Sequence, residues 1–268
     1  MHEDSDLRGK GWDPVLWVKN FNLIKWLGAN AFRTSHYPYA EEIYQLADEY
    51  GIMIIDECPS VDTDGFSDTL LAKHKQSLTE LIRRDKNHPS VIMWSISNEP
   101  SNQTILQFQG RHLDIISFNR YNGWYANPGQ TAQITNNYPE YIWSEEYQCL
   151  LISEHFKAFD LLRKAGFFAG EFIWNFADFK TPQWRVGKGP QRRRDRLQPH
   201  VRHLKWLRSI TRVGGNKKGI FTRSRQPKAA AHHLRSRYHA LATSDYGVIL
   251  PETTYYISDA QPAKHEEL

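Results

Sequence analysis

The chain has 268 residues, enough for one large domain or two small ones, and 13% of them are aromatic. This aromatic content excludes an intrinsically disordered chain, and the two cysteines, Cys58 and Cys149, exclude a disulfide framework or a cysteine-based zinc site. No apolar run approaches the ~18 residues of a membrane span, so we expect no membrane association. The first eleven residues are polar and charged, and we expect no secretory signal in this chain.

The net charge of +4 comes from one segment, residues 185–212. This segment holds ten Lys and Arg residues and one acid, so its net charge is +9 and that of the other residues is −5. It has little apolar periodicity and is flanked by two similar strings, so we interpret it as an insertion. It is either a polyanion-binding loop or a solvated, disordered excursion, and its composition favours the second. A nucleic-acid partner is not expected.

Segments typical of strands and of helices alternate along the chain. Gly28 is a predicted helix C′ residue, and Gly51 stops a predicted helix. The predicted strands are 29–34, 52–55, 91–97, 113–118 and 167–173. The predicted helices are 41–50, one capped by Asp68, one that Ser144 opens and Gly166 closes, and a last one with Pro227 in its first turn.

Strands that alternate with helices predict βαβ units, a parallel sheet and the α/β class. Polar side chains gather where the predicted strands end, at 33–36, 56–57, 98–99, 119–121 and 174–178. Because α/β barrels carry their active site at the carboxyl ends of the strands, these positions predict one shared polar pocket. The alternative is that strand ends meet loops, and loops are polar in any case.

The string Asn98-Glu99-Pro100 places a carboxyl beside an amide at a strand end. Such a carboxyl can protonate the leaving oxygen of a glycoside, while the amide binds a sugar hydroxyl. A retaining glycosidase also needs a second carboxylate about 5–5.5 Å away as nucleophile. Aromatic residues in or after the predicted strands either stack on sugar rings or pack in a barrel core: Trp94, Tyr121, Trp124, Tyr125 and Trp174.

Seven strings together carry a resemblance to one family. They are FRTSHYPYAE (32–41), IDECP (55–59), RDKNHP (84–89), MWSISNEP (93–100), FNRYNGWY (118–125), GEFIWNFADF (170–179) and GNKKGIFTR (215–223). In this order they resemble the β-glucuronidases of glycoside hydrolase family 2. The resemblance covers about residues 1–184 and 212–242, and it implies a (β/α)8 TIM-barrel-like catalytic domain.

The resemblance also implies roles for individual residues. Glu99 matches the general acid/base of the family, and Asn216 and Lys218 match an Asn-x-Lys pair that reads the glucuronate carboxylate, with Arg212 before it. A lysine ammonium beside a carboxylate separates a uronic acid from a neutral hexose. The other substrate-binding positions that the resemblance implies are His36, Asn98, Asn119, Tyr121, Tyr125 and Trp174.

The family membership so implied carries further expectations. The ligand would be a glucuronide or a glycosaminoglycan-type sugar, and no metal or cofactor is needed. The family is homotetrameric and lysosomal or secretory, although this chain shows neither a signal peptide nor the sandwich domains that precede the barrel in the family.

The sequence departs from the family pattern inside the barrel as well. Only thirteen residues separate Glu99 from Leu113, too few for a helix, a strand and another helix, so strand five of the family is expected to be deleted. The Ser/Thr-Glu-Tyr-Gly string whose Glu is the family's nucleophile is absent from the chain. We therefore expect an incomplete barrel with about five of eight strands, and hydrolysis lowered by orders of magnitude.

The expected organisation is an incomplete barrel over 1–184 and 213–242, a basic insertion over 185–212 and a tail over 243–268. Three acids are weighed as substitutes for the nucleophile. Glu145 and Glu146 open a helix, where acids are common, and Glu171 matches a position of the family that is not the nucleophile. The alternative function is a non-catalytic remnant that binds glucuronate or a polyanion.

Overall fold

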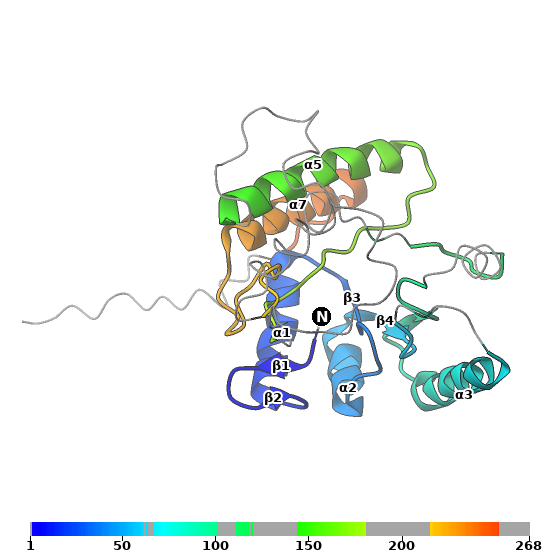
Figure 1. Ribbon diagram of the computed structural model, residues 1–268. Helices are drawn as coiled ribbons and strands as arrows, with labels where there is room; N and C mark the ends of the chain where they lie inside the picture. Colours follow the sequence, from blue (N-terminus) through cyan, green and yellow to red (C-terminus); the bar gives the residue numbers. More distant parts are fainter. Residues whose placement is uncertain are drawn as a thin grey trace, which may run out of the picture.

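The computed structural model describes residues 2–61, 63, 67–100, 111–117, 119, 144–180 and 215–251 (Figure 1). Its elements in chain order are β1 (Asp4–Ser5), β2 (Gly9–Lys10), α1 (Pro14–Leu27), β3 (Ala31–Arg33), α2 (Glu41–Tyr50), β4 (Met53–Glu57), α3 (Asp68–Asp85), β5 (Val91–Ser95), α5 (Glu145–Lys164) and α7 (Ala229–Tyr246).

A parallel sheet with the order β3-β4-β5 forms the first part of the fold. Each strand is joined to the next by a helix, α2 and then α3, so two βαβ units follow one another as predicted. Three predicted strands are confirmed with small shifts in their ends. Asp56 and Glu57, which we expected to follow a strand, are the last two residues of β4.

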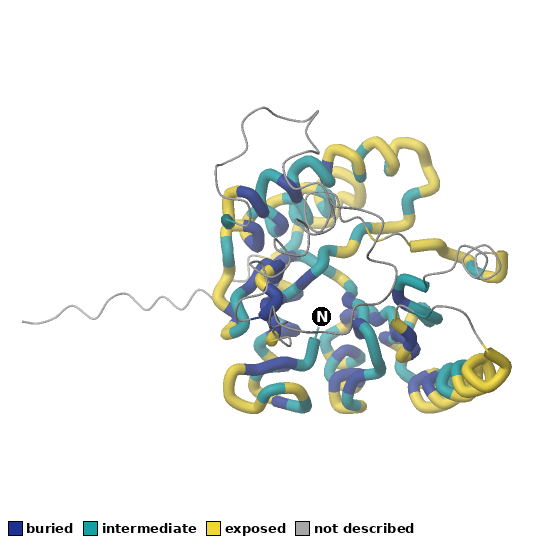
Figure 2. Tube along the Cα trace, viewed as in Figure 1, coloured by how far each residue is buried: buried dark blue, intermediate teal, exposed yellow. Residues whose placement is uncertain are grey.

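Helix α1 connects the two halves of the hydrophobic core. Its residues Trp17 and Phe21 are fully buried in a cluster with β3, α2 and β4. On another side, Leu23 and Trp26 pack in a second cluster with α5, α7 and residues 177, 220 and 221. Figure 2 shows this burial along the trace, in contrast to the exposed outer side of α3. Because α1 is apolar on two sides, the sequence shows no single apolar stripe for it.

Local capping signals place most helix ends. Gly28 and Gly51 both adopt the left-handed conformation that ends α1 and α2. The Ser144 side chain accepts the Tyr147 backbone N–H at 3.1 Å, which caps α5 as predicted. Two predictions were off by a residue or two. Ser67 caps α3 in place of Asp68, since its hydroxyl accepts the Leu70 N–H, and Pro227 lies just before α7, whose N-cap is Lys228.

Two predicted strands are wrong. Residues 111–117 form no strand, and Ile115 and Ile116 are about half exposed. Residues 167–173 form none either, and Phe167 is 73% exposed. Apolar composition favours a strand only where a neighbouring strand offers hydrogen-bonding partners. Within the described residues neither segment has such a neighbour. The parallel sheet in the described part of the chain therefore has three strands and not the five predicted.

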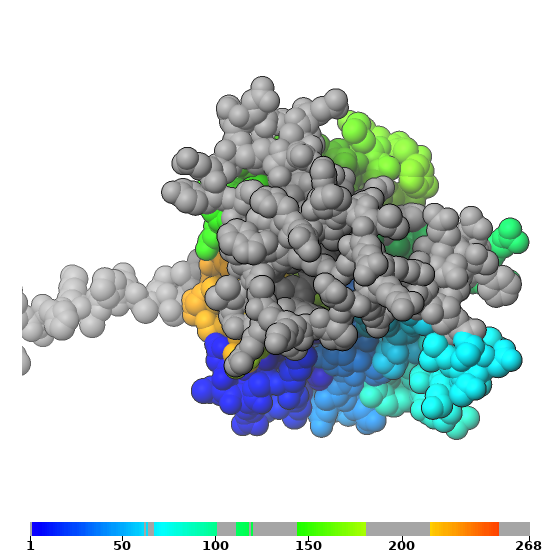
Figure 3. Space-filling model, in the orientation of Figure 1, coloured from blue at the N-terminus to red at the C-terminus, as the bar shows by residue number. Residues whose placement is uncertain are grey.

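A layer of two helices, α5 and α7, packs against α1 in the first half of the chain. Helices α5 and α7 lie side by side (Figure 1), and isolated bridges join Ala177 to Phe221 and Phe179 to Asn216. The short hairpin of β1 and β2 is tied to this part, because Arg223 donates to Asp4 at 2.8 Å and to Asp6 at 2.9 Å. Figure 3 shows the hairpin, α2 and α3 in sequence along one edge of the surface.

The fold is therefore an incomplete (β/α)8 barrel. The basic segment 185–212 lies outside the described residues, and so does the tail beyond residue 251. Helix α7 continues past residue 242, to Tyr246. In the part of the chain that the structure describes, no helix has the length and apolarity to cross a membrane.

Candidate active site

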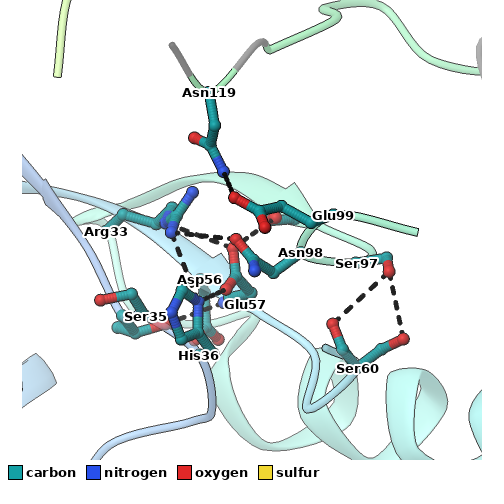
Figure 4. A network of polar contacts seen from close by, with 12 residues as sticks. Arg33, Ser35, His36, Asp56, Glu57, Ser60, Ser97, Asn98, Glu99 and Asn119 are labelled. Carbon is teal, nitrogen blue, oxygen red and sulfur yellow. Dashed lines mark hydrogen bonds and ion pairs between the residues drawn. The ribbon is translucent and has the colours of Figure 1, made fainter. Parts of the chain in front are cut away.

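Side chains from the carboxyl ends of three adjacent strands meet in one polar cluster (Figure 4). Arg33 ends β3 and His36 follows it, Glu57 ends β4, and Asn98 and Glu99 follow β5. Parallel strands present their carboxyl ends at the same edge of a sheet, which is where α/β proteins place ligands. The shared polar pocket expected from the sequence therefore has a structural basis in these three strands.

Glu57 is the centre of this cluster and is fully buried. Its Oε1 lies 3.1 Å from His36 Nδ1, and its Oε2 lies 2.8 Å from Ser95 Oγ and 3.3 Å from Arg33 Nε. Burial alone would raise the pKa of Glu57. The hydrogen bond from His36, the charge of Arg33 and the Ser95 hydroxyl outweigh burial and lower that pKa, so Glu57 is an anion at neutral pH.

A second buried carboxyl, Asp56, supports the cluster from below. The Thr34 hydroxyl donates to Asp56 Oδ1 at 3.1 Å and accepts the Glu57 backbone N–H at 2.8 Å. Tyr44 donates its hydroxyl hydrogen to the same oxygen at 2.7 Å. The end of β4 is thus held by side chains from β3 and α2, which fixes the backbone that carries Glu57.

Glu99 lies at the exposed rim of the cluster. Asn119 Nδ2 donates to Glu99 Oε1 at 2.7 Å, and Arg33 donates to the neighbouring Asn98 Oδ1 at 3.5 Å. The Asn98 backbone N–H is bonded to Ser60 O at 2.7 Å. Glu99 adopts a φ of 50°, a conformation that a residue with a side chain keeps only when its surroundings hold it. The structure therefore brings three predicted site residues, Asn98, Glu99 and Asn119, together.

His36 and Trp174 form the aromatic wall of the site. Their rings are stacked with centroids 5.1 Å apart and an angle of 23° between planes. His2, which sequence analysis missed, lies against both Trp174 (5.5 Å) and Phe179 (4.1 Å). Burial lowers the pKa of His2 to about 2, so its ring is neutral.

The Asn216–Lys218 turn is hydrogen-bonded to the segment that follows Trp174. Asn216 and Phe179 exchange two backbone hydrogen bonds, of 2.8 and 3.2 Å, and Lys218 O accepts the Asn175 N–H at 3.4 Å. The Asn216 side chain accepts the Lys218 N–H at 3.0 Å, and both side chains are buried. The next residue must be glycine, because a Cβ on Gly219 would lie 2.1 Å from the Asp178 nitrogen. The turn is thus bonded to residues that lie one and five positions after Trp174.

Three predicted site residues, Tyr121, Tyr125 and Arg212, lie outside the described residues. Two residues that the structure adds, Arg33 and Glu57, come from strings that already carried the family resemblance. Their position at strand ends was the available signal. Among the described residues, no group of three His, Cys, Asp or Glu side chains is placed to hold a metal ion.

The acids weighed as substitute nucleophiles have structural contacts elsewhere. Glu171 is buried and receives two hydrogen bonds of 2.8 Å from Arg237, with Arg163 at 3.4 Å. Glu145 accepts the Ala229 N–H at 2.8 Å, which joins the start of α5 to the start of α7. Glu146 lies in the exposed first turn of α5. These contacts assign Glu171 and Glu145 to the packing of α5 and α7.

This assignment predicts that Glu171→Ala destabilises the protein by about 2 kcal/mol. The variant leaves the Arg237 guanidinium, whose side chain is 9% exposed, with only the half-exposed Asp160 as a partner. Asp160→Ala is the matched control and should cost about 1 kcal/mol or less, because an exposed carboxylate contributes little. Urea unfolding measures both. Equal stability of Glu171→Ala and the parent chain would contradict the assignment.

Comparison with known proteins points to one family once this geometry is known. Residues 1–116 match the TIM barrel domain of the glycosyl hydrolases family 2. A β-glucuronidase of Homo sapiens is 39% identical over 306 aligned positions that include 90% of this chain. Over its first 116 residues the chain is thus similar to glycosyl hydrolase family 2. A β-glucuronidase of Mus musculus is also 38% identical to it, over an alignment that includes 92% of this chain.

Solved structures of β-glucuronidases are similar in fold to this chain. The β-D-glucuronidase of Dictyoglomus thermophilum has a TM-score of 0.70 and 35% identity, and the match covers 88% of this chain and 49% of that one. A β-glucuronidase of Ruminococcus gnavus in complex with D-glucuronic acid has a TM-score of 0.67 and 33% identity, covering 88% and 48%. The chain spans 43% of the human relative, less than half its length.

Proposed function

We propose that this chain binds a β-glucuronide but, because the nucleophile segment is missing, does not hydrolyse it above the rate of a chain that lacks Glu99. The observation that carries the binding part is the assembly around Trp174. His36 stacks on Trp174, Glu99 follows β5 and accepts a hydrogen bond from Asn119, and the buried Asn216–Lys218 turn is hydrogen-bonded to residues just after Trp174. An anionic sugar fits this arrangement of an aromatic wall, hydrogen-bonding side chains and a lysine.

The loss of hydrolysis rests on the missing nucleophile. The two-step retaining mechanism needs a second carboxylate that forms a covalent glycosyl intermediate, which water then hydrolyses. No Ser/Thr-Glu-Tyr-Gly string exists in the sequence. The alignment with the human relative is 306 positions long and thus longer than the chain itself, which supports an internal deletion. Ser244-Asp245-Tyr246-Gly247 is similar in sequence, but it ends α7, with Asp245 3.7 Å from Arg163.

The buried Glu57 is no replacement either. Both of its oxygens already accept hydrogen bonds or ion pairs from His36, Ser95 and Arg33, and the side chain is inaccessible. A nucleophile must reach the anomeric carbon with a lone pair that is not so engaged. We therefore assign catalysis neither to Glu57 nor to any other described carboxylate beside Glu99.

The test is hydrolysis of a fluorogenic β-glucuronide by the purified chain, with Glu99→Gln as control. We expect no turnover above that of Glu99→Gln, together with saturable binding of D-glucuronate in titration calorimetry. Turnover that disappears in Glu99→Gln would contradict the loss of hydrolysis. Failure of a folded protein to bind D-glucuronate would contradict the binding part. The lysosomal or secretory location and the tetramer that the resemblance implies stay predictions.

A further inference from the structure

We propose that Glu57 is a positioning residue, which fixes the His36 imidazole with its hydrogen on Nδ1 and leaves Nε2 to bind a hydroxyl of the sugar. The inference rests on the proposed function for the sugar, whereas the state of the ring can be measured without any ligand. Nothing in the sequence alone distinguished Glu57 from the other acids at strand ends.

The chemistry of Glu57 decides which nitrogen of the His36 ring carries the hydrogen. Glu57 is an anion that donates nothing, and its Oε1 lies 3.1 Å from His36 Nδ1. A bare Nδ1 would place a ring lone pair against a carboxylate oxygen in a buried site, which is unfavourable. The contact to Glu57 is the shorter of the two at this nitrogen, and it is a hydrogen bond only when the ring hydrogen is on Nδ1. Arg33 Nη2 can only donate and would need a bare Nδ1, but it lies farther away, at 3.4 Å, and its charge helps to keep the carboxylate ionised.

The plane of the ring is fixed independently. Trp174 stacks on one side of His36 with centroids 5.1 Å apart, and the His2 ring meets it edge-on at 5.8 Å. The ring therefore cannot turn about its bond to the backbone without losing the Trp174 contact and the Glu57 hydrogen bond together. Within the part of the chain that is described, no hydrogen bond is made by His36 Nε2.

A ring that carries its single hydrogen on Nδ1 presents a lone pair at Nε2. That lone pair accepts a hydrogen bond from a sugar hydroxyl that lies against Trp174, in the same wall of the site. With hydrogen on Nε2 the ring would donate instead, and the hydroxyl would have to reorient its own hydrogen toward other partners. Glu57 thus sets the direction of a hydrogen bond to the sugar without touching the sugar.

The variant Glu57→Gln tests this assignment. The glutamine side chain keeps the size of Glu57 but can turn its amide N–H toward Nδ1, which shifts the ring hydrogen to Nε2. We expect the 15N chemical shifts of His36 to report hydrogen on Nδ1 in the parent chain and a shift toward Nε2 in the variant. Affinity for D-glucuronate should fall about tenfold, the effect of one lost hydrogen bond.

Two further variants separate positioning from a general structural effect. Ser95→Ala removes another hydrogen bond of Glu57 but keeps its charge, so the His36 shifts should stay those of the parent chain. In a His36→Ala background, Glu57→Gln should cost no additional affinity, because it acts through His36.

The results that would overturn the assignment are distinct from failure of the proposed function. Hydrogen on Nε2 of His36 in the parent chain overturns it directly, whether or not Glu57→Gln folds. An equal loss of affinity in the presence and absence of His36 would overturn it as well. Nδ1–H in a parent chain that fails to bind D-glucuronate would leave Glu57 as the residue that fixes the ring and contradict the sugar-binding proposal alone.

Discussion

Replacing Lys218 by methionine is expected to weaken the binding of D-glucuronate about a hundredfold and to leave the binding of D-glucose unchanged. A hydrogen bond between an ammonium and a carboxylate contributes about 1.5–3 kcal/mol when it is shielded from water, and 1.4 kcal/mol corresponds to a factor of ten. Lys218 is 6% exposed, so its interactions are poorly screened by solvent. Methionine fills a similar volume without the charge, so the turn around it keeps its packing.

The neighbouring lysine provides a matched control. Lys217 is one residue away in the same turn, but its side chain is exposed. Lys217→Met removes an equal charge and should change neither affinity by more than about twofold, because an exposed charge at this site is screened. Titration calorimetry with both sugars gives the ratio of affinities. If Lys218→Met weakened D-glucose binding as much as D-glucuronate binding, Lys218 would support the fold of the turn and would not select the uronic acid.

Local signals predicted the parts of the fold that depend on neighbouring residues. Ser144 and Gly28 are examples, because a cap is formed within one turn of its own helix. Signals that depend on distant residues failed. The 113–118 segment has the composition of a strand, but strand formation requires a partner that the sequence does not supply. The end of helix α1 was predicted from Gly28, but its start and extent were not, because its apolar residues face two clusters and form no single stripe.

The candidate site shows the same division. Glu99, Asn98 and His36 were predicted because their strings are specific, and the structure brings them to one edge of the sheet. The role of Glu57 could not be read from its string, since three contacts from β3 and β5 decide it. His2 was missed for a similar reason. Its contacts are with residues 36, 174 and 179, all distant in sequence.

The second large effect concerns the buried pair of Asp56 and Asp85, below the site. Both carboxyls are fully buried, and Asp85 is the neighbouring charge that acts on Asp56. Arg84 donates two bonds to Asp85, of 2.6 and 2.7 Å, while Asp56 Oδ1 accepts from Tyr44 and Thr34. Burial, together with the neighbouring Asp85, raises the pKa of Asp56 to about 7. The raised pKa favours a proton on Asp56 in the folded protein below about pH 7.

This proton makes stability depend on pH with a definite sign. The pKa of Asp56 is raised on folding from its ordinary value of 3.8, so the folded protein binds more protons than the unfolded chain between about pH 4 and pH 7. The stabilisation is fully present below the unfolded pKa and is lost as the pH rises through the folded one. A rise of this size corresponds to a loss on the order of 3 kcal/mol across the interval.

Asp56→Asn is expected to remove this loss. The asparagine oxygen still accepts from Tyr44 and Thr34, and its amide donates to Asp85 as protonated Asp56 does. The variant should therefore gain on the order of 3 kcal/mol relative to the parent chain between pH 4.5 and pH 7.5, measured by urea unfolding at both values.

Asp48→Asn is the control of opposite sign. Burial opposes the shift there, but hydrogen bonds from Ser90 and His88 outweigh it and lower the pKa of Asp48, so its contribution is present above the unfolded pKa and is lost in acid. The loss of unfolding free energy that Asp48→Asn causes at neutral pH should therefore shrink as the pH falls below the unfolded pKa of Asp48. A difference between Asp56→Asn and the parent chain that stays constant from pH 4.5 to 7.5 would mean that the pair holds no extra proton. The carboxyls would then both be charged under the site, stabilised by Arg84, Tyr44 and Thr34 alone.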